Sequence, residues 1–275
     1  MSPPESVIAT LQAFSNEPVA TYCGVLITIA IPAFNEEELL PSTLAAVAEA
    51  GEAFSQRGWE MEVVVCDNNS TDSTAEIAEA AGARVVFEEH NQISRARNAA
   101  GNASKGEWII FIDGDSKPSK ALFEATAVAM DEKEIVGGGA TVKFEVKQHW
   151  MFTLCLVVWN AVSRVMRMPS GSYIFCRAED FLELNGFSEE FYAGEEIDFG
   201  RRLKKLGKQC RQRLQILNQT PLATSPRRFQ FIAQSHYPPT AGLEILLKGM
   251  FSMVFTGGRA LHKVDNCYMW YDGKR

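Results

Sequence analysis

The chain has 275 residues, of which 46% are hydrophobic and 22% are charged, as expected for a globular protein with a large core. Its net charge of -7 and pI near 5.3 argue against a nucleic-acid-binding surface, which is usually basic. The six cysteines form no CxxC pair and mostly lie in apolar runs, so we expect reduced thiols and neither disulfides nor a zinc site.

The first half of the chain is predicted to alternate strands with helices. Apolar, largely β-branched runs at 25–31, 62–66, 84–87 and 108–112 predict buried strands, and amphipathic helical patterns lie between them. This alternation is typical of an α/β fold with a doubly wound, mostly parallel sheet flanked by helices.

Beyond residue 130 the pattern changes. We predict a glycine-punctuated strand at 135–144, an unusually apolar helix at 148–168, a strand at 171–177 and a helix at 195–206. No linker rich in Pro, Gly or Ser divides the chain. We therefore expect one α/β domain preceded by an N-terminal extension and followed by a helical C-terminal extension, with these bounds: 1–24, 25–220 and 221–275.

Polar side chains follow three of the predicted strands at the point where each ends. Asn35 and Glu36 follow the first, Asp67 follows the second, and Asp113 and Asp115 follow the fourth. Ligands of such sheets bind at the carboxyl ends of the strands, so we expect these side chains to converge on one crevice.

The Asp113-Gly114-Asp115 loop is the strongest single signal for a metal. Two carboxylates suit Mg²⁺ or Mn²⁺ that also binds phosphate oxygens, and Gly114 removes a side chain where a diphosphate must come close. An acidic turn is the alternative interpretation. The position of the loop directly after an apolar strand favours the metal site.

Other polar residues leave two interpretations open. Asp67 is expected to accept a hydrogen bond from a nucleobase, whereas Asp72 is expected to cap the following helix. Arg95, Arg97 and Asn98 lie on an alanine-rich helix, where they either hold diphosphate oxygens or form a solvated face.

Glu195 and Glu196 open the predicted helix at 195–206. Negative charge is favoured at the start of a helix, which suffices to explain one of them. The other could serve as a general base that takes a proton from a hydroxyl group. Their spacing does not show which is which.

Several motifs stand in order along the chain: Pro32–Glu37, Asp67–Asp72, Arg95–Asn98, Asp113–Asp115, Gly186–Glu189 and Glu195–Leu203. Together they resemble the family 2 glycosyltransferases of the GT-A fold, over about residues 25–210. The resemblance implies an inverting hexosyltransferase that moves a sugar from a nucleotide-diphosphate donor, commonly a UDP-sugar, to an acceptor hydroxyl.

The resemblance also implies roles for individual residues. Ala33, Glu36 and Asp67 fall on nucleoside-contacting positions, and the donor-binding set as a whole comprises Ala33, Phe34, Glu36, Asp67, Asn68, Arg95, Asn98, Asp113 and Gly114. Asp115 holds Mg²⁺ or Mn²⁺ together with Asp113, and His236 is a candidate third ligand from the C-terminal region. Glu196, where the family usually has aspartate, is the expected base, with Glu195 as the alternative.

Rival functions are less well supported. A nucleotidyltransferase would need a basic Gly-rich loop after the first strand, where this sequence instead has the acidic segment Pro32–Glu37. A dinucleotide oxidoreductase would need GxGxxG after a strand, and no predicted strand is followed by that motif. A non-catalytic nucleotide-sugar-binding protein stays open. The acceptor also stays open among polysaccharides, lipid-linked molecules and small molecules.

Localisation rests on the apolar segments. Residues 1–22 lack the basic start and apolar block of a signal peptide, so we expect a cytoplasmic protein. The apolar segments 150–159 and 242–255 are shorter than the ~20 residues of a membrane span. We expect both to pack as core or as a homodimer interface. The alternative is peripheral contact with the inner face of a membrane, for which nearby cations would suit anionic headgroups: Arg164, Arg167, Arg227 and Arg228.

Overall fold

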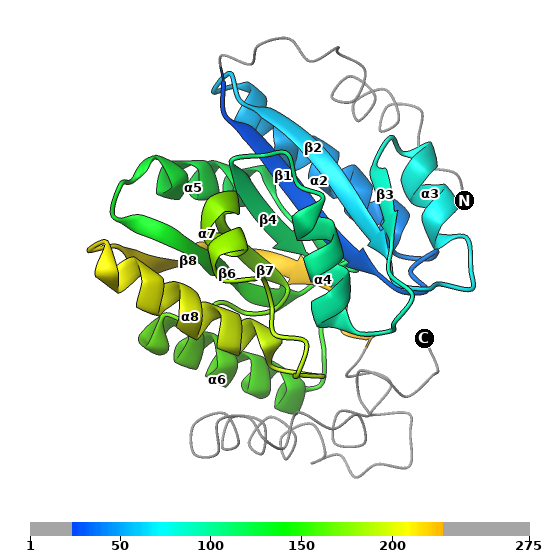
Figure 1. Ribbon diagram of the computed structural model, residues 1–275. Coiled ribbons are helices and arrows are strands. Elements are labelled where there is room, and N and C mark those ends of the chain that lie inside the picture. The colour runs from blue at the N-terminus through cyan, green and yellow to red at the C-terminus, as the bar shows by residue number, and fades with distance from the viewer. Residues whose placement is uncertain (1–23, 228–275) are drawn as a thin grey trace.

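The computed structural model describes residues 24–227 (Figure 1). At its centre is an eight-stranded sheet with the strand order β3-β2-β1-β4-β7-β6-β8-β5. The strands are β1 (Leu26–Ala33), β2 (Glu60–Asp67), β3 (Arg84–Phe87), β4 (Trp108–Ile112), β5 (Ser116–Lys117), β6 (Ile135–Phe144), β7 (Tyr173–Arg177) and β8 (Arg213–Thr224). The helices are α2 (Leu40–Ser55), α3 (Thr74–Ala80), α4 (Ile93–Asn102), α5 (Lys120–Asp131), α6 (Trp150–Met166), α7 (Ala178–Glu183) and α8 (Glu195–Gln209).

The first half of the sheet confirms the predicted parallel strands. β1 lies between β2 and β4 and is parallel to both, and β3 is parallel to β2. The register places Ala33 opposite Asp67, so the carboxyl ends of β1 and β2 are level. This arrangement brings the loops that follow the two strands together at one edge of the sheet.

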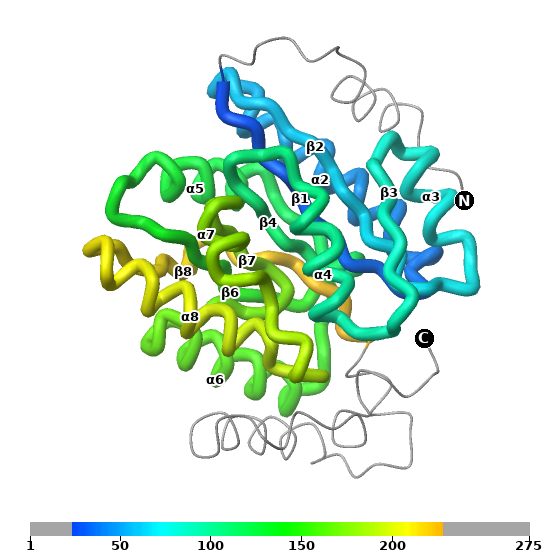
Figure 2. The backbone as a smooth tube through the Cα atoms, in the orientation of Figure 1, coloured from blue at the N-terminus to red at the C-terminus, as the bar shows by residue number. Residues whose placement is uncertain are grey.

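The second half of the sheet mixes directions. β7 is antiparallel to β4 and to β6, whereas β8 runs parallel to β6 and pairs with the short β5. Figure 2 shows how β8, late in the chain, returns to lie beside β6. The domain boundary expected at residue 220 therefore falls inside β8, which continues as part of the sheet to Thr224.

The apolar strands separate two hydrophobic layers because alternate side chains point to opposite faces. In β1, Ile29 and Ile31 pack with α2, α3 and α5, while Ala30 packs with the layer beneath α4, α7 and α8. The second group of helices covers the face turned to the viewer in Figure 1. Full burial of one such isoleucine stabilises the fold by about 1.5–3 kcal/mol.

The three glycines predicted to punctuate a strand lie in β6, between β7 and β8. A Cβ atom on Gly138 would overlap the carbonyl oxygen of Gln215 in β8. A Cβ on Gly139 would lie 2.6 Å from Cβ of Pro169. Glycine is required here because neighbouring backbone approaches too closely for any side chain.

Helix α6 packs on the sheet through one face only. Asn160 fixes it there, since its amide accepts a hydrogen bond from the Val142 N–H (3.0 Å) and donates one to the Val142 carbonyl (2.8 Å). Its buried residues are Phe152, Cys155 and Ser163. Of the two expectations for this apolar segment, core or homodimer interface, packing as core therefore applies to one face of the helix only.

No helix within residues 24–227 is both long and apolar enough to cross a bilayer. In the same range the cysteines are free thiols, as the sequence predicts, and three of the four are buried. Burial raises the pKa of the Cys66 thiol to about 12, so this side chain stays protonated and unreactive.

Candidate active site

The loops that follow β1 and β2 are linked to each other by hydrogen bonds. The Asn35 N–H donates to Ser70 Oγ (3.0 Å), and Asn35 Oδ1 accepts from the Thr71 N–H (2.8 Å). The Glu36 N–H donates to Thr74 Oγ1 (2.8 Å). Asn35 has a positive φ of 51°, a conformation that asparagine tolerates better than most residues. The two loops therefore form one platform at the edge of the sheet.

Asp67 and Asp72 have different surroundings on this platform. Asp72 accepts hydrogen bonds from the N–H groups of Thr74 (3.0 Å) and Glu37 (3.1 Å), so it stabilises the start of α3 and the neighbouring loop. The structural role predicted for Asp72 is thus confirmed. Asp67 is buried at the end of β2, where Oδ1 accepts from the Ser70 N–H (3.0 Å).

Asn68 holds the segment that leads into α4. Its Nδ2 donates to the carbonyls of Glu88 (3.1 Å) and His90 (2.6 Å), and its Oδ1 accepts from the Gln92 N–H (3.0 Å). Both amide hydrogens are used in these contacts. The structure therefore gives Asn68 a positioning role, beside the donor-binding role that the sequence predicts.

Helix α4 also holds the loop that precedes α8. The Asn98 amide exchanges two hydrogen bonds with the backbone of Phe187 (2.8 and 2.9 Å), and Arg95 forms an ion pair with Glu189 (2.9 Å). Gly186 has a φ of 63°, and a Cβ atom there would collide with Asn98 Oδ1. These contacts explain the Gly186–Glu189 motif and place Arg95 and Asn98 against a loop, outside the pocket lining.

Arg97 lies on the same helix but points into the protein, where it is 1% exposed. Its guanidinium forms ion pairs with Glu195 and Asp113 (2.9 Å to the latter) and donates to the Gly171 carbonyl (2.8 Å). Burial alone would lower the pKa of Arg97, but Asp113 and Glu195 raise it on balance. Arg97 thus stays charged and links the loop after β4 to the start of α8.

The Asp113-Gly114-Asp115 loop directly follows β4, as predicted. Thr43 of α2 donates a hydrogen bond to the Gly114 carbonyl (2.8 Å). A Cβ atom on Gly114 would lie 3.3 Å from Cγ of Glu36, so glycine allows the loops after β1 and β4 to meet. The Arg227 guanidinium contacts the Glu36 carboxylate and lies 4.0 Å from Asp115. A positive group is thus already held between these acids.

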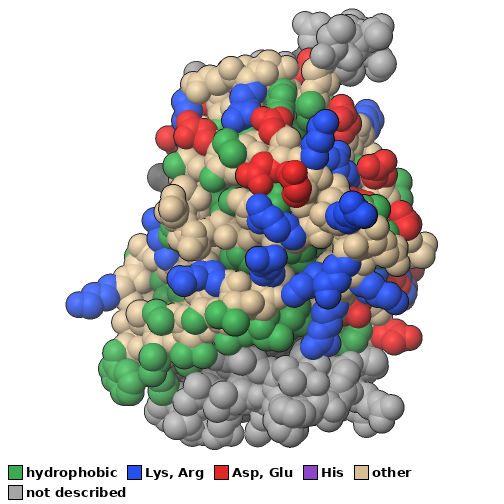
Figure 3. Space-filling model, turned by 90° about the vertical axis from the view of Figure 1, so that its left-hand side faces the viewer, with side chains coloured by type: hydrophobic (Ala, Val, Ile, Leu, Met, Phe, Trp, Pro, Cys, Tyr) green, Lys and Arg blue, Asp and Glu red, His purple; other side chains and the backbone are tan. Residues whose placement is uncertain are grey.

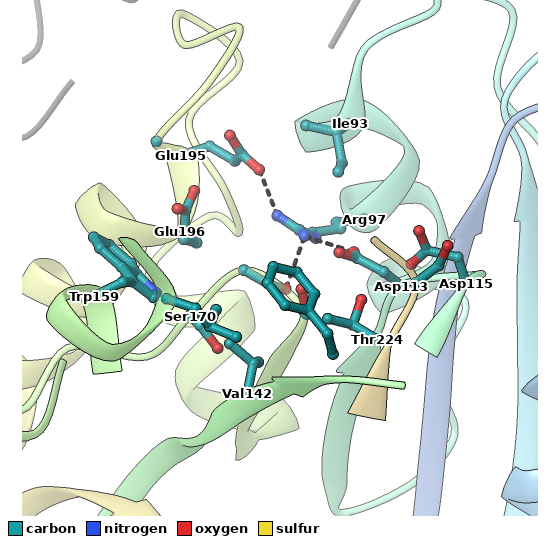
Figure 4. A pocket seen from close by; sticks show the side chains of 16 residues that line it. Ile93, Arg97, Asp113, Asp115, Val142, Trp159, Ser170, Glu195, Glu196 and Thr224 are labelled. Carbon is teal, nitrogen blue, oxygen red and sulfur yellow. Dashed lines mark hydrogen bonds and ion pairs between the residues drawn. The ribbon is translucent and has the colours of Figure 1, made fainter. Parts of the chain in front are cut away.

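A pocket of about 200 Å³ opens beside this loop (Figure 4). Arg97, Asp113 and Asp115 line one side, and Glu195 and Glu196 at the start of α8 line another. Apolar side chains from β6 and α6 complete the wall: Val142, Phe144, Leu156 and Trp159. Figure 4 shows Arg97 between Glu195 and Asp113, and Trp159 on the side of Glu196.

The two glutamates of α8 differ in charge state. Glu195 is buried and neutralised by Arg97. Glu196 is half-buried, and its burial together with the nearby Glu195 raises its pKa from 4.5 to about 8. A carboxyl group with such a pKa can exchange a proton near neutral pH, which is the property a general base requires. The structure thereby distinguishes the two residues, which their spacing in the sequence does not.

The other predicted residues are placed as follows. Ala33 and Phe34 end β1 beside Asp67, and Glu36 adjoins Gly114. The residues that line the pocket include neither Ala33 nor Asp67. His236, Arg228 and the segment 242–255 lie outside the described residues.

Sequence reasoning missed three features of the site: the hub formed by Arg97, the contact of Arg227 with Glu36, and the wall formed by Trp159. For Arg97 the sequence signal was weak, because Arg95 lies among the same small side chains of α4 and stays partly exposed. No sequence signal brings Arg227 to Glu36, since 191 residues separate them.

The sheet order, the acidic loop after β4 and the pocket at the strand ends define a GT-A glycosyltransferase fold. The same fold occurs in S. aureus TarS in complex with UDP-GlcNAc, which matches at a TM-score of 0.58 and 20% identity over 90% of this chain and 79% of that chain. A mannosyltransferase of Pyrobaculum calidifontis in complex with GDP-Man and Mn²⁺ matches at a TM-score of 0.59 and 16% identity over 97% and 81%.

The sequence profile of Glycosyl transferase family 2 matches residues 28–181, which is more than half of the chain. The chain therefore belongs to this family. It is 37% identical over 92 residues to the uncharacterized glycosyltransferase Rv0539 of Mycobacterium tuberculosis. That similarity covers 34% of this chain and 38% of the relative.

Proposed function

We propose that the chain is an inverting, metal-dependent hexosyltransferase that uses a nucleotide-diphosphate sugar. The observation that carries the proposal is the convergence of Asp113, Asp115 and Glu196 on one pocket, in which burial and Glu195 raise the pKa of Glu196. Asp113 and Asp115 are suited to the part of the pocket that would hold the diphosphate leaving group. Glu196 is suited to the part that would hold the acceptor hydroxyl. The platform formed by the loops after β1 and β2 supplies the nucleoside side, with Asp67 at its base.

The residues present fit Mg²⁺ or Mn²⁺. The Arg227 guanidinium lies against Glu36 and 4.0 Å from Asp115, and this position of a positive group supports the binding of a cation there. Within residues 24–227 no three side chains are grouped to hold a metal alone, which is the usual situation where one or two carboxylates bind Mg²⁺ and phosphate oxygens complete the shell. Asp115 would hold the ion, since Asp113 is paired with Arg97. When bound, the ion would neutralise charge on the departing diphosphate.

Glu196 would act as the base. The acceptor hydroxyl oxygen forms a bond to the anomeric carbon as the bond from that carbon to the diphosphate oxygen breaks, and Glu196 takes the hydroxyl proton. The nucleoside diphosphate leaves with the electron pair, and attack from the opposite side inverts the anomeric centre. Arg97 keeps Glu195 ionised beside Glu196, which favours proton uptake at Glu196.

UDP is the favoured nucleotide. The TarS structure, which shares the fold, contains UDP-GlcNAc, although the mannosyltransferase contains GDP-Man. The apolar wall that includes Trp159 would face the acceptor, because it adjoins Glu196 and lies away from the nucleoside platform.

The proposal is tested by thermal shift with UDP-, GDP- and dTDP-sugars in the presence and absence of Mn²⁺. A ligand that binds only the native state at 100 times its Kd stabilises it by about 2.7 kcal/mol. We expect a metal-dependent rise in Tm with a UDP-sugar. If no nucleotide sugar raises the Tm of the wild-type protein, the proposal is wrong. Binding without any turnover would instead favour a non-catalytic nucleotide-sugar-binding protein.

A further inference from the structure

The outward face of α6 is an apolar stripe that faces solvent. Trp150, Val157 and Val165 are 69%, 57% and 84% exposed, and Leu154 and Val158 continue the same stripe. With 3.6 residues per turn, the five positions fall within about 100° of one another around the helix axis, so they lie on one side of the helix. Large apolar side chains that are exposed together indicate an interaction surface.

The opposite face of α6 is fixed and adjoins the active site. Asn160 holds the backbone of β6 through two hydrogen bonds. Leu156 and Trp159 line the pocket that contains Glu196. The apolar stripe is therefore presented by a rigidly attached helix, and only the thickness of that helix separates it from the pocket.

The stripe is bordered by positive charge. The chain contains no acidic residue between Glu145 and Glu179, and none between Phe199 and Arg213, although the whole protein has a net charge of -7. Figure 3 shows apolar side chains along the lower edge of the described surface and Lys and Arg side chains gathered above them.

The cations come from α6 and from the C-terminal half of α8. The two helices meet where Lys204 Nζ donates to the Met166 carbonyl (2.8 Å). Burial lowers the pKa of Lys204, and the positive charges of Lys208 and Arg167 lower it further. The cations at this junction therefore repel one another, and a bound anionic partner would relieve that repulsion.

We propose that the outward face of α6 and the adjoining cations of α8 form a surface that docks onto an anionic lipid bilayer. Apolar side chains at the boundary with the acyl chains, flanked by Lys and Arg at the headgroups, are typical of helices that lie in a membrane interface. A second copy of the chain is a poorer partner, because a two-fold contact through α6 would bring two basic borders together.

The test is co-sedimentation of the full-length protein with vesicles of phosphatidylglycerol and phosphatidylcholine, compared with vesicles of phosphatidylcholine alone. We expect binding to the anionic vesicles that weakens as salt rises. The variant Arg164→Glu/Lys208→Glu should lower the partition coefficient at least about 30-fold, because it removes and reverses two surface cations. The variant Leu154→Glu/Val157→Glu should lower it at least about tenfold.

Matched controls separate this surface from general effects of charge. Val128 on α5 is 50% exposed, and Lys105 is exposed beyond α4, so Val128→Glu and Lys105→Glu make the same kinds of change elsewhere. Both should bind vesicles as the wild type does. None of these residues lines the pocket, so binding of UDP-sugars should be unchanged in every variant.

Three results would overturn the proposal. The first is a wild-type protein that stays in the supernatant with anionic vesicles at low salt. The second is vesicle binding that survives both α6 and α8 variants, which would place the membrane contact elsewhere. The third is a dimer that Leu154→Glu/Val157→Glu converts to monomers without any effect on vesicle binding, because the stripe would then be an interface between copies.

Discussion

Replacement of Glu196 by glutamine is expected to stabilise the protein near neutral pH. The folded state raises the pKa of this carboxyl from 4.5 to about 8, chiefly through burial and then through Glu195. At a pH between these values, the side chain is ionised in the unfolded state and protonated in the folded state. Folding must then take up a proton, which opposes folding. Glutamine resembles the protonated form and avoids this penalty.

The size of the effect follows from the shift. At about pH 7.5 the folded carboxyl is still mostly protonated, so the penalty spans about three pH units at ~1.4 kcal/mol each, or about 4 kcal/mol. Solvent reaches half-buried Glu196 through the pocket, and its screening reduces the expected gain to about 2 kcal/mol. For a protein of this size, that corresponds to a rise in Tm of about 4–8 °C.

The gain has a defined pH dependence. Below the unfolded pKa of 4.5 both states are protonated, so Glu196→Gln should leave stability unchanged. The difference between variant and wild type should grow as pH rises and become complete above about 8. Urea denaturation of both proteins across this range measures the difference directly.

Glu195→Gln is the matched control with the opposite sign. Glu195 neutralises buried Arg97, so its replacement should destabilise the protein near neutral pH. If Glu196→Gln destabilises the protein at about pH 7.5, or if its effect does not vary with pH, the assigned protonation state of Glu196 is incorrect.

Three further changes test other parts of the structure. Arg97→Met leaves Asp113 and Glu195 buried without their cation, so the free energy of unfolding measured with urea should fall by about 3–5 kcal/mol. A fall below about 1 kcal/mol would show that the ion pairs are dispensable. Asp115→Ala should abolish Mn²⁺-dependent UDP binding in calorimetry while Tm stays near that of the wild type; unchanged binding would contradict the metal assignment. Gly138→Ala should lower stability by about 1–3 kcal/mol, since its Cβ would overlap the Gln215 carbonyl, and an unchanged urea midpoint would refute that packing.

The sequence predicts the first half of the fold well because local signals are strong there. Trp108–Ile112 is buried on both faces of the sheet, so all five of its residues are apolar. Such a continuous apolar run is typical of a central strand and is easily recognised in the sequence. The order β2-β1-β4 then brings the loops at Glu36 and Asp113 together, as predicted from the strand ends.

The second half depends on long-range pairing that the sequence does not show. β8 contains Pro221 and several polar residues, and its pairing with β6 shifts register between Ala140 and Val142, so no regular alternation marks it as a strand. The roles of Glu195 and Glu196 likewise depend on Arg97, which lies about 100 residues earlier in the chain. Side-chain burial in the folded protein, and not the spacing of the two glutamates, separates them.

The most direct test of the central claim is the turnover of Glu196→Gln with a UDP-sugar and Mn²⁺, measured as the UDP that is released when the sugar is transferred to water or to an acceptor. The account predicts a fall of about 10²–10⁴-fold, the usual contribution of a general base, with an unchanged Kd for the donor. Turnover close to that of the wild type would contradict it, since Glu196 would then not be the group that takes the acceptor proton.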